Sequence, residues 1–128
     1  MAENIKRYNF RKLDIWKDSI VLASDIIKAT RALPDIERFG LVSQMNRSSV
    51  SIPSNIAEGA ARKSNKSFVN FLEMALGSGF ELESQLIISN TVEYIRNEEF
   101  ESLLAKCQSI QNRTYSLSKN LKTNETKL

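Results

Sequence analysis

Apolar residues recur at alternating spacings of three and four along four long stretches of this 128-residue chain, and this period constrains the fold more than any other feature. The stretches cover residues 13–31, 36 or 39 to 62, 66–94, and 97 to the polar tail. Only four Gly and two Pro residues are available for tight turns. The sequence therefore predicts an all-α, up-down-up-down four-helix bundle.

Each stretch has a seam, meaning a line of apolar or small residues at helical spacing that should pack against neighbouring helices. The four predicted seams are Leu13, Trp16, Ile20, Ala23 and Ile27; Val42, Met45, Ser49, Ile52, Ile56 and Gly59; Phe68, Leu72, Ala75, Gly79, Leu82 and Leu86; and Phe100, Leu103, Cys107, Ile110, Thr114, Leu117 and Leu121. The third stretch carries a second apolar line through Val69, Leu76, Phe80, Ile87 and Tyr94. Part of that surface is predicted to be an oligomer interface.

Length and composition predict one domain over residues 1–128, with a basic arm at 1–12 and a polar tail at 122–128. Hydrophobic residues make up 41% of the chain and charged residues 26%, as in folded globular proteins. No apolar run approaches the roughly 20 residues of a membrane span, and the N-terminus has no apolar signal core. We therefore expect a cytoplasmic protein without membrane contact, whose single cysteine, Cys107, is a small buried hydrophobe.

The chain contains no histidine. This absence removes the commonest general base and the commonest metal ligand. Glu81 and Glu83 lie two residues apart and so point to different faces of a helix. We expect no catalytic residues, no metal site and no cofactor, and hence a protein that is not an enzyme.

The stretch SIPSNIAEG, residues 51–59, places Pro53 inside the second predicted helix. Proline lacks an N–H group, so the Ser49 carbonyl loses its helical partner and the helix bends. A helix that starts at Pro53 is the alternative, but Ile52 would be a poor N-cap. We favour one long helix kinked at Pro53. In either case, Ser51, Ser54 and Asn55 are suited to satisfying loosened backbone groups, and Glu58 to pairing with Arg62.

Charge is distributed unevenly along the chain, although the net charge is only +3. Two basic groups are the candidate nucleic-acid contacts: Lys6, Arg7, Arg11 and Lys12, and then Arg62, Lys63 and Lys66. Tyr8 and Phe10 interleave with the first group and could stack on single-stranded bases. Residues 73–101 are acidic, and Glu93, Glu98 and Glu101 would suit a basic protein partner.

Several spaced motifs resemble a known bacterial family. They are LDIWKDSIVLA (13–23), FGLVSQ (39–44), SIPSNIAEG (51–59), RKS (62–64) and LGSGFELESQL (76–86). The chain is similar, over about residues 10–120, to four-helix bundle proteins first noticed as reading frames inside intervening sequences of 23S rRNA genes. The resemblance implies ring-like homopentamers with a central channel and no known catalytic residues. One related branch is the accessory protein of diversity-generating retroelements, which is basic, binds nucleic acid and partners a reverse transcriptase.

With that resemblance, the motif residues are interpreted as determinants of the bundle and its interfaces. This structural set is Ser51, Pro53, Asn55, Glu58, Gly59, Gly77, Gly79 and Glu81. Gly77 and Gly79 are expected where another backbone packs closely, and Glu81 and Glu83 are expected to pair with cations such as Arg47 or Arg62 of a neighbouring helix or subunit.

The predicted function is that of a non-enzymatic oligomeric scaffold or chaperone that binds RNA or DNA. A ring of five chains would repeat each basic patch five times. The alternative is a protein-interaction module that docks a basic partner, such as a reverse transcriptase or a ribosomal protein, without touching nucleic acid.

Overall fold

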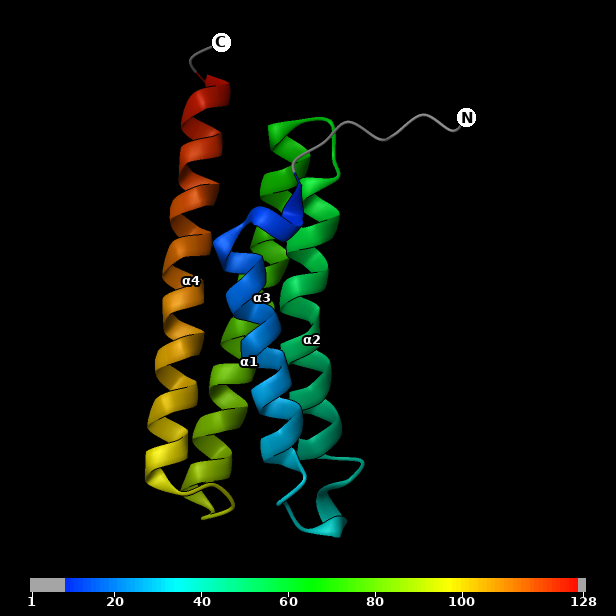
Figure 1. Ribbon diagram of the computed structural model, residues 1–128, viewed down its shortest axis with the longest axis vertical. Coiled ribbons are helices and arrows are strands. Elements are labelled where there is room, and N and C mark those ends of the chain that lie inside the picture. Colours follow the sequence, from blue (N-terminus) through cyan, green and yellow to red (C-terminus); the bar gives the residue numbers. More distant parts are fainter. Residues whose placement is uncertain (1–8, 127–128) are drawn as a thin grey trace.

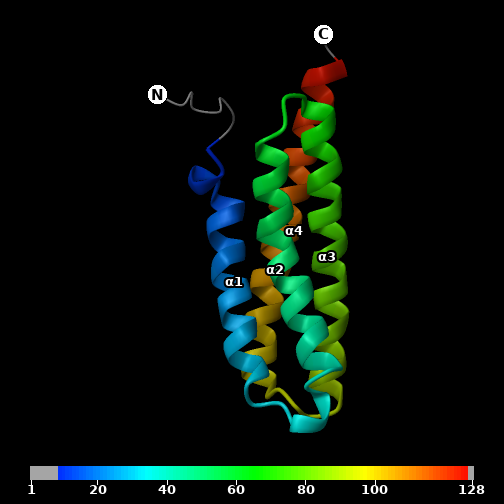
Figure 2. The same ribbon diagram turned by 90° about the vertical axis from the view of Figure 1, so that its right-hand side faces the viewer.

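Four α-helices make up most of the computed structural model, which describes residues 9–126. They are α1 (Asp14–Thr30), α2 (Leu41–Ala60), α3 (Asn65–Thr91) and α4 (Asn97–Thr126), and two short 3₁₀ helices, η1 (Phe10–Lys12) and η2 (Asp35–Glu37), precede α1 and α2. Consecutive helices are antiparallel neighbours, α4 returns to contact α1, and α1 and α3 lie on opposite sides (Figures 1 and 2). The predicted all-α four-helix bundle is confirmed, with no strand among the described residues.

The two ends of the bundle are different. The η1 helix, the α2–α3 turn and the end of α4 lie at one end, and the α1–α2 and α3–α4 connections lie at the other (Figure 1). Helix α4 continues to Thr126, so most of the predicted polar tail is helical. None of the helices within residues 9–126 is both long and apolar enough to cross a membrane.

Helix boundaries follow local capping. The Ser64 hydroxyl accepts a hydrogen bond from the Ser67 N–H (3.1 Å), which makes Ser64 the N-cap of α3. Helix α2 begins at Leu41 because the preceding segment forms η2, and Gly40 is not helical. The Glu37 carboxylate accepts hydrogen bonds from the Leu41 N–H (3.4 Å) and the Tyr94 hydroxyl (3.0 Å), which joins both connections at this end. The hydrogen bond to Glu37 raises the pKa of Tyr94.

The predicted seams of α2, α3 and α4 form the core, with only Val42, Phe100 and Leu117 half-buried at the margins. The predicted seam of α1 is only partly correct: Ala23 is buried, and Leu13 and Trp16 pack against the core. The core face of α1 runs through Ile15, Ser19, Leu22, Ile26 and Ala29, while Ile20 and Ile27 remain 39% and 38% exposed. Helix α1 has apolar residues at helical spacing on two adjoining faces, and only packing decides which face turns inward.

Pro53 lies inside α2, which is continuous from Leu41 to Ala60, so the alternative of a helix start at Pro53 is wrong. The polar neighbours bond backbone carbonyls near the proline. The Ser54 hydroxyl donates to the Val50 carbonyl (2.9 Å), and the Asn55 amide donates to the Ser51 carbonyl (2.9 Å). The Ser51 hydroxyl also accepts a hydrogen bond from the Ser78 hydroxyl of α3 (2.8 Å), which links α2 to α3 at this point.

Three glycines of the motif stretches have different surroundings. A Cβ on Gly59 would lie 2.8 Å from Phe68 Cδ1 and from Phe71 Cβ, and a Cβ on Gly79 would lie 2.9 Å from Gln111 Nε2. Helices therefore approach both glycines closely, although the neighbours are side chains rather than backbone. A Cβ on Gly77 would meet nothing within 4 Å, so the prediction of close packing at Gly77 is wrong within a single chain.

Candidate nucleic-acid interface

Five of the seven predicted contact residues lie at one end of the bundle. Arg11 and Lys12 belong to η1, Arg62 and Lys63 follow α2, and Lys66 lies in the first turn of α3. All five are exposed, and their elements meet at the same end in Figure 1. This group is called the basic end below. Lys6 and Arg7 lie outside the described residues.

Most cations of the basic end have no acidic partner. Arg62 pairs with Glu58 (4.0 Å), as predicted, and lies over the Phe71 ring (4.5 Å to the centroid). That ion pair is well exposed and contributes little to stability. The other four cations form no ion pair within the described part of the chain. The first turn of α3 contains no acidic residue, so its helix dipole adds to the positive potential.

The predicted stacking residue Phe10 is less available to nucleic acid than the predicted cations are. Phe10 is half-buried and packs edge-on against Trp16, with ring centroids 5.1 Å apart. This packing makes Phe10 part of the fold rather than a free stacking surface. Tyr8 lies outside the described residues.

The opposite end carries acidic residues around the α3–α4 turn. Glu93, Glu98, Glu99 and Glu101 are all exposed there and form the acidic end. Two large apolar residues of the α1–α2 connection, Ile36 and Phe39, are 85% and 87% exposed at the same end. The sequence reasoning missed them because it assigned this segment to the start of a helix. The motif FGLVSQ, which begins at Phe39, was the available signal.

The glutamates of α3 pair with neighbouring helices of the same chain. Glu81 forms an ion pair with Arg47 of α2, which confirms one of the two predicted partners. Glu83 instead accepts a hydrogen bond from Gln108 of α4 (3.3 Å). Both interactions lie at or near the surface, so they contribute little to the stability of the fold.

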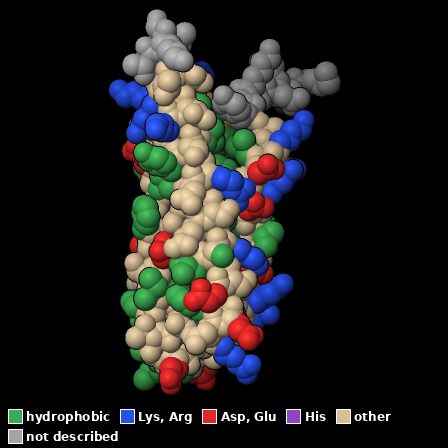
Figure 3. Space-filling model, turned by 90° about the vertical axis from the view of Figure 1, so that its left-hand side faces the viewer, with side chains coloured by type: hydrophobic (Ala, Val, Ile, Leu, Met, Phe, Trp, Pro, Cys, Tyr) green, Lys and Arg blue, Asp and Glu red, His purple; other side chains and the backbone are tan. Residues whose placement is uncertain are grey.

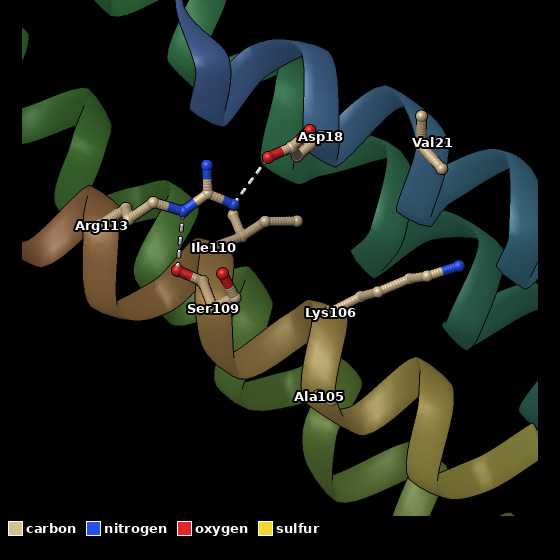
Figure 4. A pocket seen from close by; sticks show the side chains of 7 residues that line it. All are labelled: Asp18, Val21, Ala105, Lys106, Ser109, Ile110 and Arg113. Atoms are coloured by element: carbon tan, nitrogen blue, oxygen red, sulfur yellow. Dashed lines mark hydrogen bonds and ion pairs between the residues drawn. The ribbon is translucent and has the colours of Figure 1, made fainter. Parts of the chain in front are cut away.

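A groove of about 330 Å³ lies between α1 and α4 (Figure 4). Its charges are paired: Arg113 with Asp18 inside the groove (2.7 Å), and Lys106 with Asp25, which lies outside the lining (2.7 Å). Val21 and Ile110 supply the apolar lining. Within residues 9–126, no three His, Cys, Asp or Glu side chains converge as metal ligands. The groove therefore offers no activated nucleophile or base for a reaction.

Cys107 is fully buried on α4, and its thiol lies 3.5 Å from the Gly79 carbonyl oxygen. Burial, with a smaller contribution from the charge of Glu83, raises the pKa of Cys107 to about 12. The thiol therefore stays protonated at neutral pH. We expect iodoacetamide at pH 8 to alkylate the native protein at least about 100-fold more slowly than the urea-unfolded protein, as followed by intact mass. Equal rates in the two states would contradict the burial of this thiol.

The fold and its surface define a class of protein: a four-helix bundle with a group of mostly unpaired cations at one end and a group of exposed glutamates, accompanied by Arg38 and Arg96, at the other. The chain belongs to the 23S rRNA-intervening sequence protein family, whose model matches residues 11–116. A solved structure from Bacteroides thetaiotaomicron, described as a protein of unknown function from the S23 ribosomal protein family, is similar at a TM-score of 0.77 and 29% identity. The similarity covers 82% of this chain and 98% of that one. A search of curated proteins finds no match.

Proposed function

We propose that this protein is a non-enzymatic scaffold or chaperone that binds RNA or DNA through its basic end. The observation that carries the proposal is the placement of Arg11, Lys12, Arg62, Lys63 and Lys66 at one end by three different elements. Phosphate binding needs several cations on one surface, because its affinity comes largely from the release of counterions. A group of mostly unpaired cations meets that need.

In this proposal, the protein acts as an oligomer in the cytoplasm, and the expected assembly is a ring-like homopentamer. One bundle offers five cations at the basic end, whereas rotational symmetry would repeat them in every subunit. A bend of α2 at Pro53 would adapt the bundle to such a ring, and Gly59 allows α3 to approach the same helix.

Binding measurements with three labelled probes test the function: single-stranded RNA, duplex RNA and duplex DNA, each at low and at physiological salt. The oligomer mass is recorded on the same samples. We expect at least one probe to bind tightly at low salt, with an affinity that falls steeply as salt rises. An intact oligomer that binds no probe at low salt would overturn the proposal.

The acidic end supports a second candidate function, the docking of a basic protein. Ile36 and Phe39 are highly exposed at the same end, and Arg38 lies over the Phe39 ring (5.4 Å to the centroid). Exposed apolar and acidic side chains at one end suit a partner with an apolar pocket and a basic rim. This function would replace the first if the oligomer binds no nucleic acid. It also predicts that reversing Glu93, Glu98 and Glu101 abolishes partner binding while the oligomer persists.

A further inference from the structure

Helix α4 is polar on its buried side as well as on its outer side. Figure 3 views the bundle from the α4 side, where side chains that are neither hydrophobic nor charged, drawn in tan with the backbone, make up most of the surface along this helix. Three more polar residues of α4, Gln111, Thr114 and Ser118, are only 9%, 1% and 3% exposed. A bundle helix normally turns apolar residues towards the core. Polar residues that take their place need hydrogen-bond partners, because a buried polar group without one is destabilising.

Two of these residues have polar atoms without a partner. The buried hydroxyls of Ser19, Ser48 and Ser89, on the other three helices, each donate a hydrogen bond of 2.7 to 2.9 Å. Gln111 Nε2 and Thr114 Oγ1 are buried too, but neither has a hydrogen-bond partner within residues 9–126. The large majority of buried side-chain polar atoms in proteins are hydrogen-bonded, either to protein or to ordered water. The pair therefore indicates a bound group that both side chains contact.

The side chains of Gln111 and Thr114 are neighbours on one face of α4. Residues three apart on a helix have about 5–6 Å between their Cβ atoms. The Gln111 side chain lies across Gly79 of α3, where a Cβ would be 2.9 Å from Nε2 and 3.1 Å from Cγ. The hydroxyls of Thr91 and Thr123 donate to carbonyls four residues earlier in their own helices (2.7 and 3.0 Å), whereas the Thr114 hydroxyl does not. Both unpartnered atoms are therefore free to hydrogen-bond a group that lies between them.

We propose that Gln111 and Thr114 bind one ordered water molecule inside the bundle, where α4 packs against α3. In this site the Gln111 amide donates a hydrogen bond to the water oxygen, and the Thr114 hydroxyl, which can donate or accept, forms the second. Two hydrogen bonds of about 2.9 Å that meet at one water span about 5 Å, which matches the spacing of these neighbours. Water suits the site better than an ion does, because both groups are uncharged and a buried ion needs an opposite charge beside it.

The water site gives Gln111 and Gly79 a joint role in the register of α4 against α3. The amide that holds the water occupies the room left by the missing Cβ of Gly79. A shift of α4 by one turn would move the amide towards Ala75 or Glu83, which lie one turn away on the same face of α3 and have side chains. The observed register is therefore the one that gives the amide room beside the water.

A high-resolution crystal structure of the full chain tests the site directly. We expect one ordered water at about 2.7–3.2 Å from both Gln111 Nε2 and Thr114 Oγ1. A Thr114 hydroxyl that donates to the Ile110 carbonyl instead, or a Gln111 amide with no water beside it, would overturn the proposal.

The effect of Thr114→Val on stability tests the same site in solution, by urea unfolding of a chain whose folding is verified by circular dichroism. Valine keeps the shape of threonine and lacks the hydroxyl. Loss of a hydroxyl that holds the water should raise the equilibrium constant of unfolding at least about fivefold, because the Gln111 amide then stays buried with a weakened partner. Removal of a hydroxyl that has no partner would instead leave the protein equally stable or more stable.

A control and a double variant complete the test. Thr123→Val makes the same change at an exposed position of α4, and its effect is expected to be smaller than that of Thr114→Val. A shared water also predicts that the fold-changes of Thr114→Val and Gln111→Met do not multiply in the double variant, because either substitution alone disrupts the site. A Thr114→Val effect no larger than that of the control, or fold-changes that multiply, would count against the water. None of these outcomes bears on whether the basic end binds nucleic acid.

Discussion

Reversing two charges of the basic end, in the variant Lys63→Glu/Lys66→Glu, is expected to weaken binding of single-stranded RNA by about 50-fold at about 50 mM salt. Both side chains are exposed, and neither pairs with an acidic residue of the described chain, so the fold should not depend on them. Each phosphate contact that is lost should also reduce the slope of log affinity against log salt by about 0.7. Fluorescence anisotropy over a series of salt concentrations measures both effects.

The matched control for this variant lies at the other end of the bundle. Arg38→Glu/Arg96→Glu changes the net charge by the same amount at two exposed positions near the acidic end. The affinity of the control for single-stranded RNA should stay within about threefold of the wild-type affinity. Charges that lie more than a Debye length of about 10 Å from the bound RNA are screened by salt and contribute little. Equal losses in the two variants would show that overall charge, and not the basic end, governs binding.

The fold could be predicted from the sequence wherever one face of a helix dominates. Helices α2 and α4 each have one line of apolar and small residues, and most of both lines is buried. Helix α3 has two lines, of which the one from Phe68 to Leu86 is buried, while Phe80 and Ile87 of the other are exposed. Helix α1 has two candidate lines, Leu13–Ile27 and Ile15–Ala29, whose hydrophobicity is similar. The choice between them depends on contacts with α2 and α4, which no local pattern of α1 contains.

The composition of the basic end could also be predicted, because topology alone places it. In an up-down-up-down bundle, the segment before the first helix and the turn between the second and third helices lie at the same end. Residues 11–12 and 62–66 therefore lie at the same end without any long-range pairing. The environment of each side chain could not be predicted. The contact of Arg62 with Phe71 and that of Phe10 with Trp16 depend on how side chains pack across helices.

The surroundings of individual glycines could not be predicted from the sequence. The motif GSGFELESQL suggested the same role for Gly77 and Gly79, yet one lies against Gln111 and the other has open space around it. Two positions in a helix point about 160° away from each other when they are two residues apart. The same spacing that separates Glu81 from Glu83 therefore gives these glycines different surroundings, one packed against Gln111 and the other open.

Replacing Gly59 by alanine is expected to destabilise the bundle by about 1–3 kcal/mol, despite the better helix propensity of alanine. The new Cβ would lie 2.8 Å from both Phe68 Cδ1 and Phe71 Cβ. The Phe68 ring is fully buried, and the Cβ of Phe71 is fixed to the backbone of α3, so neither atom can move aside alone. Helices α2 and α3 must separate instead. Urea unfolding followed by circular dichroism measures the change in the free energy of unfolding.

The other two glycines calibrate this prediction, and all three variants are compared by the same urea unfolding measurement. Gly77→Ala should stabilise the protein by up to about 1 kcal/mol, because its Cβ meets nothing and glycine is a poor helix former. The change in the free energy of unfolding for Gly79→Ala should fall between the other two. Its Cβ meets the flexible side chain of Gln111, whose Nε2 has no hydrogen-bond partner within the described chain to lose. If Gly59→Ala were as stable as Gly77→Ala, the close approach of α2 and α3 at this glycine would be wrong.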